Sequence, residues 1–572
     1  MANIENLLPI TGTEWTYEFA AHLLERVGFA GTPAEIEGLA AMGPQQAVES
    51  LVNYAAIDDS DLPAFEESGF WDDGLLTSTY TRPAATMRAE RTGEAMGVKV
   101  KRSGTRPLQT VTNRWFYWRR ASVLEARRLA FWWTDRMLRT PRPLEEKMTL
   151  FWHGHFTSSH EKVRDYRKIQ QQLGTLRRGA TGNFRDLLLA LSRDPAMLLY
   201  LDAAENVKGA PNENFGREVM ELFTLGVGNY TENDIREAAR AFTGWTNNDL
   251  EFVIDEAKHD DGEKTFLGRA GRFRGEDILS IILEQKQTAE YIATKLYSFF
   301  VRDDVPDGFR ERLGALLRDN NYEIAPFLKT IFLSKDFYST ASLGSHIKSP
   351  TELIVSSYRR LGVRELPGVP DPYSVGKVLG QILLDPPTVA GWAQGRAWIT
   401  PGLLFERANF AREVLFPDLM EFKDPNLDPG EQVRKVNRNI RAGMDMTAAS
   451  MEEGAAPSRS AGIQETFNTR YGSLIGWQEA MRKLKPISRR AAQFNLSEIV
   501  SEAGATTTTQ AVQVLTRQLL TVPLSATTEE ALVRMLDEEL GTSLLAEAES
   551  YMEHGLRMAA HLIMSAPQYQ FA

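Results

Sequence analysis

The sequence predicts a mainly α-helical protein: a multi-helical single large core, a small β-hairpin insertion and a C-terminal helical region. Most of the chain divides into segments whose apolar side chains recur at helical spacing, and many segments begin with residues typical of helix N-caps. The exception is Leu250–Phe273, where apolar and polar residues alternate around Asp260-Asp261-Gly262. This alternation predicts a hairpin with its tip at the Asp-Asp-Gly sequence.

The first helices are marked by their ends. Between Glu14 and Val27 apolar side chains repeat every four residues, and Gly28 ends the segment. The sequence Thr32-Pro33-Ala34-Glu35 then combines a capping threonine, a proline suited to the first turn and a glutamate that can complete a capping box. His22 lies on the apolar face of the first helix, which favours a packing role.

The same criteria predict helices along the rest of the chain. Arg114–Arg139 carries tryptophans at helical spacing, interleaved with arginines. This pattern favours a helix whose tryptophans face the core and whose arginines reach the surface. The alternative, a face that stacks on bases or sugars, is less favoured. Shorter helices are predicted at Asn183–Ser192, Glu213–Leu225, Glu232–Phe242, Gly275–Glu284, Thr288–Phe300, Ile324–Leu333, Thr509–Leu520, Thr528–Leu540 and Leu545–Ile563.

Composition suggests five regions. They are an N-terminal helical region (1–75), a basic loop (76–108), a helical core with the motif segments (109–424), a linker-like segment (425–475) and a C-terminal helical region (476–572). The basic loop reads as a solvated segment, with an anion-binding arm as the alternative. The linker-like segment is rich in Ala, Ser, Met and Gly and lacks a periodic apolar face.

Composition also excludes several classes of protein. The absence of cysteine rules out disulfides, thiolate zinc sites and cysteine nucleophiles. A net charge of -11 disfavours a nucleic-acid partner, because phosphate binding needs a positive field. No window approaches the ~20 apolar residues of a transmembrane segment, and the start lacks an export signal, so the sequence alone indicates the cytoplasm.

The candidate catalytic residues are Glu218, Glu221 and His155. On the helix that starts near Glu213, Glu218 and Glu221 lie one turn apart and can converge on one cation or proton, although a solvated flank is the commoner arrangement for such pairs. His153 and His155 follow an apolar run and point to one metal only if the helix ends at Gly154, because on a helix they diverge. The candidate ligands of a possible divalent metal are His153, His155, Glu218, Glu221 and His259.

Taken together, these segments resemble the bacterial family of unknown function DUF1800. The matching segments run in order over almost the whole chain: Ala21-His22-Leu23-Leu24, Phe151-Trp152-His153-Gly154-His155-Phe156, Asn212-Glu213-Asn214-Phe215, Glu221-Leu222-Phe223-Thr224-Leu225-Gly226, Thr243-Gly244-Trp245, His259-Asp260, Lys348-Ser349-Pro350, Gly391-Trp392, Gly395-Arg396-Ala397-Trp398-Ile399 and His561-Leu562-Ile563-Met564-Ser565. Two departures stand out: Gly154 replaces the more usual Asn, and no export signal is visible. The resemblance implies a protein that is often exported and often encoded beside a sulfatase-like protein, which is therefore an expected partner.

Two functions follow as hypotheses. The first is a His/Glu site that acts by metal-dependent or acid–base catalysis. The alternative is a non-catalytic binding or assembly protein that serves a partner enzyme or a cell-surface polymer, with Trp392 and Trp398 stacking on sugar or protein. The first hypothesis requires His153 or His155 to lie within direct, water-mediated or metal-mediated reach of Glu218 or Glu221.

Overall fold

A computed structural model describes residues 7–75, 109–306, 308–417, 434, 438 and 469–572. The predicted basic loop and most of the linker-like segment lie outside the described residues. The rest is mainly helical, with short strands confined to residues 245–271, which confirms the predicted fold class. Within the described part of the chain, no helix is both long and apolar enough to span a membrane.

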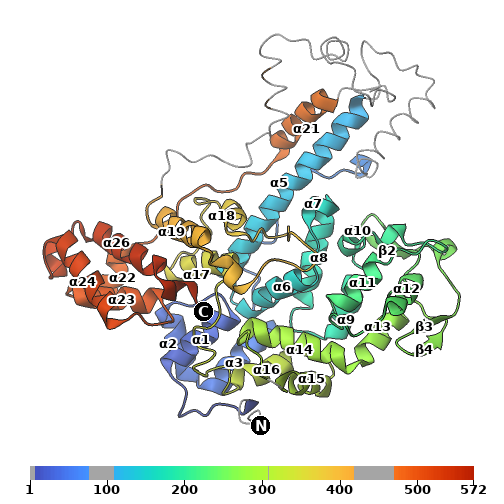
Figure 1. Ribbon diagram of the computed structural model, residues 1–572. Helices are drawn as coiled ribbons and strands as arrows, with labels where there is room; N and C mark the ends of the chain where they lie inside the picture. The colour runs from blue at the N-terminus through green and yellow to red at the C-terminus, as the bar shows by residue number, and fades with distance from the viewer. Residues whose placement is uncertain (1–6, 76–108, 307, 418–433, 435–437, 439–468) are drawn as a thin grey trace.

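The N-terminal half forms the base and the right-hand part of the molecule in Figure 1. Its helices are α1 (Tyr17–Val27), α2 (Pro33–Met42), α3 (Pro44–Val52), α5 (Gln109–Arg139), α6 (Pro143–His155), α7 (His160–Val163), α8 (Tyr166–Arg178), α9 (Phe184–Ser192), α10 (Pro195–Tyr200), α11 (Asn214–Glu221), α12 (Glu232–Ala241) and α13 (Gly275–Glu284). Short 3₁₀ turns join them: η2 (Tyr54–Ala56), η3 (Asp73–Leu75), η4 (Ala203–Glu205) and η5 (Glu256–Lys258).

The second half covers the base and adds a helical group at one side (Figure 1). It comprises α14 (Lys286–Phe300), α15 (Phe309–Asp319), α16 (Ile324–Leu333), α17 (Pro350–Arg360), α18 (Pro372–Leu379), η6 (Gly395–Trp398), α19 (Pro401–Leu415), α21 (Thr469–Lys483), α22 (Leu496–Glu502), α23 (Thr508–Leu519), α24 (Ala526–Leu540), α25 (Leu545–Ala548), α26 (Met552–Ser565) and η8 (Pro567–Gln570).

Helix starts follow the capping signals in the sequence. Thr32 accepts from the backbone N–H of Glu35, whose side chain accepts in return from the Thr32 N–H, so the predicted capping box at α2 is confirmed. Asn183 caps α9 in the same role. The predicted helix Leu545–Ile563 is instead broken into α25 and α26, because the backbone leaves the helix at residues 549–551.

The β region contains two hairpins rather than one. β1 (Trp245–Asn248) pairs with β2 (Glu251–Ile254), and β3 (Lys264–Phe266) pairs with β4 (Arg269–Gly271), both antiparallel. Their turns lie at Asp249 and at Leu267-Gly268, where the backbone adopts positive φ. Asp260-Asp261-Gly262 therefore connects the two hairpins and is not a hairpin tip, which corrects the sequence-based prediction.

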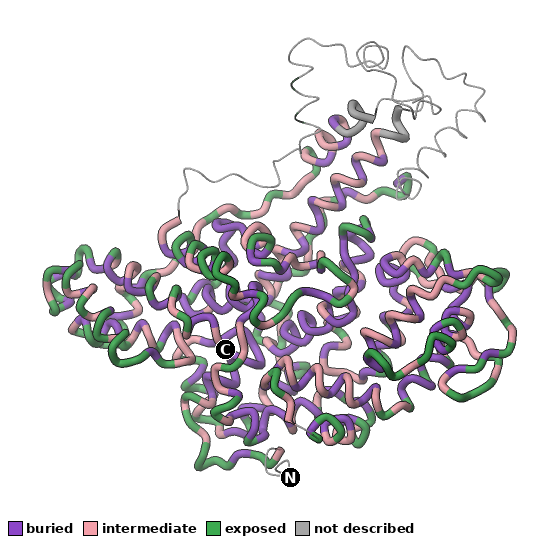
Figure 2. Tube along the Cα trace, in the orientation of Figure 1, coloured by how far each residue is buried: buried purple, intermediate pink, exposed green. Residues whose placement is uncertain are grey.

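One continuous core joins the helices, as the buried segments in Figure 2 show. It runs from α1 to η8 and includes the C-terminal helices, so the predicted single large core is confirmed. A smaller cluster forms where the first half of α5 packs on α21, with Trp118, Tyr166 and Ala480 at its centre. In Figure 1 these two helices run side by side away from the body.

The α5–α21 contact depends on one glycine. A Cβ atom at Gly476 would lie 2.4 Å from the backbone nitrogen of Tyr117, closer than any side chain can approach. We therefore expect Gly476→Ala to lower the free energy of unfolding by about 1–3 kcal/mol, since the two helices must separate. Gly402→Ala in α19, where a Cβ would meet nothing within 4 Å, is the control and should be neutral or slightly stabilising. Equal urea-unfolding midpoints for the two variants would contradict the packing described.

Candidate functional site

The last turn of α6 carries both predicted histidines. The helix continues through Gly154 to His155, so the two imidazoles leave on different sides, as helical geometry requires. The condition for both rings to approach one metal, a helix that ends at Gly154, is therefore not met. Gly391, with φ +91°, lies against this turn, because a Cβ there would be 2.5 Å from the Gly154 carbonyl oxygen.

His153 is a buried core histidine. Its Nε2 accepts a hydrogen bond of 3.2 Å from the backbone N–H of Leu384, and its ring packs between Trp133 and Trp392. Burial lowers the pKa of His153 to about 3, so the ring is neutral at physiological pH. An imidazole whose lone pair accepts a backbone N–H is not available to a metal through that nitrogen.

His155 reaches the helix that carries the predicted glutamates, but through the backbone. Its Nε2 lies 3.1 Å from the carbonyl oxygen of Phe223, just beyond the end of α11. Because a carbonyl only accepts, Nε2 carries the proton and Nδ1 is left with a lone pair that has no partner among the described residues. Burial, followed by the charge of Lys295, holds the pKa of His155 well below its usual range.

Glu218 and Glu221 lie one turn apart on α11, as predicted. Glu221 accepts a 2.6 Å hydrogen bond from the hydroxyl of Tyr230. Glu218 is half-buried, and burial together with the neighbouring Glu221 raises its pKa. The structure records no hydrogen bond or ion pair between either carboxylate and His153 or His155, so the prediction of direct contact is not met. A link through water or metal stays a prediction.

His259 lies in the segment that connects the two hairpins. Its Nδ1 donates to the carbonyl oxygen of Thr243 at 2.9 Å, and the Thr243 hydroxyl accepts from the Asp260 N–H at 2.8 Å. Arg240 pairs with Asp260, and Lys264 donates to the Asp260 carbonyl oxygen. These contacts explain the His-Asp sequence structurally. Across the described ranges, no group of three or more His, Asp or Glu side chains is arranged to hold a metal ion.

The geometry instead points to a cavity beside His155. It has a volume of about 80 Å³, enough for several waters or a small organic molecule. Four segments form most of its wall, namely the last turns of α6, the C-terminal half of α14, residues 346–352 and the loop 390–398, and Asp303 and Gln381 complete it. Its polar or ionisable lining residues are His155, Lys295, Ser298, Asp303, His346, Ser349, Glu352, Gln381, Trp392, Gln394 and Trp398.

His346 and Glu352 form an oriented pair in this cavity. Ser349 caps α17, and the reciprocal capping box turns the Glu352 carboxylate back over the helix start, where the Ser349 N–H donates to it at 2.7 Å. The same Oε2 lies 3.1 Å from His346 Nε2, while Oε1 pairs with Lys147. Burial opposes ionisation, but Lys147 holds the pKa of Glu352 below its usual value, so the carboxylate stays charged.

Lys295 enters the cavity from α14 without a counter-ion. The described residues place no carboxylate within ion-pair distance of its Nζ, which lies 5.2 Å from the centre of the Tyr291 ring. Burial lowers the pKa of Lys295 to about 8. Tyr291 fixes this part of α14 by donating to the Leu222 carbonyl oxygen at 3.0 Å, next to the Phe223 carbonyl that His155 binds.

Trp392 and Trp398 line the cavity and are buried, with 8% and 7% of their surfaces exposed. Little of either ring is therefore left to stack on an external sugar or protein, and that role stays a prediction. Both indole N–H groups lack a partner within the described part of the chain. A buried donor without a partner carries a desolvation cost unless a bound molecule or a water accepts from it.

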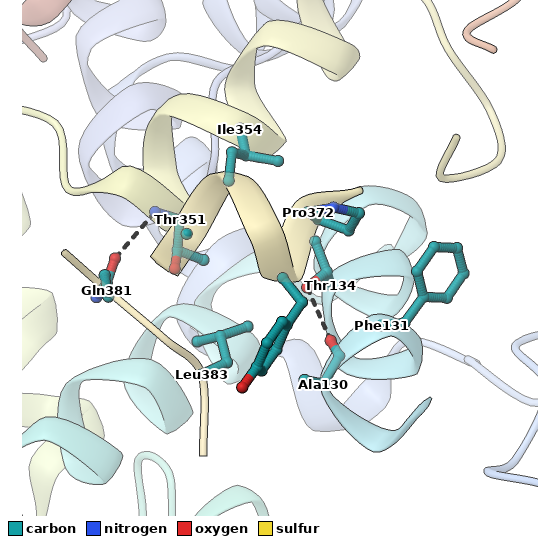
Figure 3. A pocket seen from close by; sticks show the side chains of 10 residues that line it. Ala130, Phe131, Thr134, Thr351, Ile354, Pro372, Gln381 and Leu383 are labelled. Atoms are coloured by element: carbon teal, nitrogen blue, oxygen red, sulfur yellow. Dashed lines mark hydrogen bonds between the residues drawn. The ribbon is translucent and has the colours of Figure 1, made fainter. Parts of the chain in front are cut away.

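Two other hollows lack these features. Figure 3 shows a pocket of about 20 Å³ between α5, α17 and α18, in which Gln381 accepts from the Thr351 N–H at 2.9 Å. It has room for about one water and holds no acid–base pair. A groove of about 450 Å³ runs along α8 and α9. Its Asp194 has a pKa raised to about 7 by burial, but it serves as the N-cap of α10.

The family comparison fits this arrangement. The profile of the family described as "Protein of unknown function (DUF1800)" matches residues 22–571. The chain belongs to the DUF1800 family. No curated protein and no solved structure matches it. For this DUF1800 chain, the match runs from within α1 through the cavity walls to the C-terminal residues.

Sequence reasoning missed Lys295 and His346. Nothing marks Lys295 in an ordinary helical pattern, because its lack of a counter-ion is a property of the packed structure. His346 had a usable signal: Ser349-Pro350-Thr351-Glu352 is a capping box with proline at the first position, and it directs a carboxylate to the residues just before the cap.

Four buried histidines make acid sensitivity predictable. Burial lowers the pKa of His22 and His153 to about 3, of His160 to about 4, and of His155 well below 6.5. Each histidine favours the neutral form in the folded state. Its contribution to the free energy of unfolding is therefore complete above pH 6.5 and is lost as the pH falls below 6.5 towards the pKa of the folded state. We expect a loss of up to about 1.4 kcal/mol per pH unit per histidine, measured by urea unfolding between pH 6.5 and 4.

His153→Gln should be less stable than the parent at pH 7 but show a shallower pH slope. His561→Gln, at a partly exposed histidine, is the control and should leave the slope unchanged. Identical slopes in all three proteins would show that the buried rings do not titrate as described.

Proposed function

We propose that this protein is an acid–base enzyme acting on a small polar organic molecule in the cavity beside His155. The observation that carries the proposal is the His346–Glu352 pair, set in the same cavity as a lysine without a counter-ion. A histidine oriented by a charged carboxylate is a common general acid and base. Lys295 supplies a second group that can exchange a proton near neutral pH.

Each group has a distinct task in this proposal. His346 takes or gives the proton, and Glu352 positions the imidazole and stabilises its protonated form. The indole N–H groups of Trp392 and Trp398 donate to oxygen atoms of the bound molecule.

Proton exchange tests the proposal directly. The purified protein is incubated in D₂O with a panel of small carbonyl and carboxylic compounds, and ¹H NMR follows loss of C–H signal. We expect catalysed exchange with at least one compound and a fall of about 10²–10⁴-fold in His346→Gln. Lys286→Met, at an exposed lysine of α14, the helix that carries Lys295, should retain full exchange. Exchange that survives His346→Gln, or none across the panel, contradicts the proposal.

Glu218 and Glu221 stay a proposed proton-holding pair, supported by the raised pKa of Glu218 and its lack of a hydrogen bond. Their proposed role with His153, His155 and His259 in binding a divalent metal also stays a prediction. Metal analysis tests it: below ~0.1 metal per chain, with no thermal shift on adding divalent ions, the metal site is contradicted.

A binding or assembly role is the second candidate. The observation that favours it is the apolar surface of α19, where Phe405 is 74% exposed. Leu404, next to it, is 41% exposed, and neighbouring exposed apolar side chains are the feature that suits an interaction site. Native mass spectrometry after co-expression with the expected sulfatase-like partner tests this role. A complex lost in Phe405→Ser supports it, and a strictly monomeric parent chain counts against it.

A further inference from the structure

Three buried or half-buried lysines surround the base of the cavity, and they differ in one respect. Lys147 pairs with Glu352, and Lys348 lies 3.1 Å from the Glu25 carboxylate. Lys295 has neither an ion pair nor a hydrogen bond to the residues that the structure describes. Two of the three amines are therefore paired with a carboxylate, and the third is not neutralised by the protein. Burial lowers the pKa of Lys348 to about 8 as well, so the missing ion pair is what sets Lys295 apart.

The surroundings of Lys295 favour an uncharged amine. Apolar or aromatic groups contribute much of the wall, including Phe151, Phe299 and Trp392. With a pKa of about 8, about one Lys295 in ten is neutral at pH 7, against about one in 2,500 for an ordinary lysine. A neutral amine in a partly dry site is a nucleophile rather than an ion-pairing group.

The charge of the lining disfavours a simple anion site. Asp303 and the ionised Glu352 also line the cavity, so an anionic occupant would meet two carboxylates as well as the lysine. A neutral carbonyl group avoids this repulsion, and its oxygen can accept from an indole N–H. The volume of about 80 Å³ limits the occupant, or the part of it that enters, to a few non-hydrogen atoms.

We infer that Lys295 forms a covalent imine with a small aldehyde or ketone bound in this cavity. This inference deepens the proposed acid–base function and rests on the cavity being its site. The neutral Nζ attacks the carbonyl carbon, and the oxygen takes up the proton lost by nitrogen to give a carbinolamine. The hydroxyl then leaves as water with a proton from His346, and the second N–H proton returns to His346 as the C=N bond forms. No oxidant or reductant is needed.

Reductive trapping tests the imine. The full chain is incubated at pH 7 with acetaldehyde or hydroxyacetone and cyanoborohydride, which converts an imine into a stable secondary amine. Peptide mapping by mass spectrometry then gives the rate of modification at each lysine. We expect Lys295 to react about 10²-fold faster than Lys286, which is exposed on the same helix and paired with Glu290. The α-amino group, whose usual pKa is also about 8, is an internal positive control.

Variants separate the imine from simple accessibility. In His346→Gln, Lys295 remains but should be labelled at least about 10-fold more slowly, because the carbinolamine no longer has a proton donor for the loss of water. Lys295→Met should lose this adduct and keep the others. Labelling of Lys295 no faster than Lys286 in the folded parent overturns the inference. Lys295-dependent proton exchange without an adduct leaves the acid–base function standing without the imine, whereas an adduct without exchange supports the imine alone.

Discussion

A buried ion-pair network is the constraint on which this structure depends. Glu25 of α1 pairs with Lys348 at 3.1 Å and with Arg360 of α17 at 2.5 Å, and all three side chains are buried. Burial disfavours its ionised form, but Arg360 and Lys348 outweigh this and lower the pKa of Glu25 to about 2. Such a network need not add stability over an apolar core, but removal of one member costs about 3–5 kcal/mol because the other charges stay buried. It therefore fixes how α1 and α17 dock.

The network also builds the cavity. Arg26, next to Glu25 on α1, donates to the carbonyl oxygens of Phe299 and Phe300 and so fixes the end of α14 beyond Lys295. Arg407 of α19 donates to the Lys348 carbonyl oxygen at 2.7 Å and to the Trp398 carbonyl oxygen at 3.1 Å. The cavity walls are thus held in part by two buried guanidinium groups that donate to backbone carbonyl oxygens.

Local signals explain why the fold was largely predictable. Helices with complete start signals, such as α2 behind Thr32 and α9 behind Asn183, begin where the sequence placed them. The hairpin region was located but its topology was not, because Asp260-Asp261-Gly262 is as good a turn sequence as those at Asp249 and Leu267-Gly268, where the backbone turns with positive φ. At the site, the sequence predicted reach between His153 or His155 and Glu218 or Glu221, whereas the contact that the structure records is between His155 and the Phe223 carbonyl oxygen. Spacing along a helix gives direction but cannot show which atoms of a distant segment meet it.

The His-Gly-His sequence is best understood as two contacts of one helix end. A helical turn directs His153 towards Leu384 and Trp392, and His155 towards Phe223 and the cavity. Gly154 lies between them against Trp392, where a built Cβ would be 3.6 Å from the ring, an ordinary contact. Packing therefore does not require glycine at position 154 and would tolerate a small side chain there. The required glycine is Gly391, whose positive φ and close approach to the Gly154 carbonyl exclude a side chain and bring Trp392 into the cavity wall.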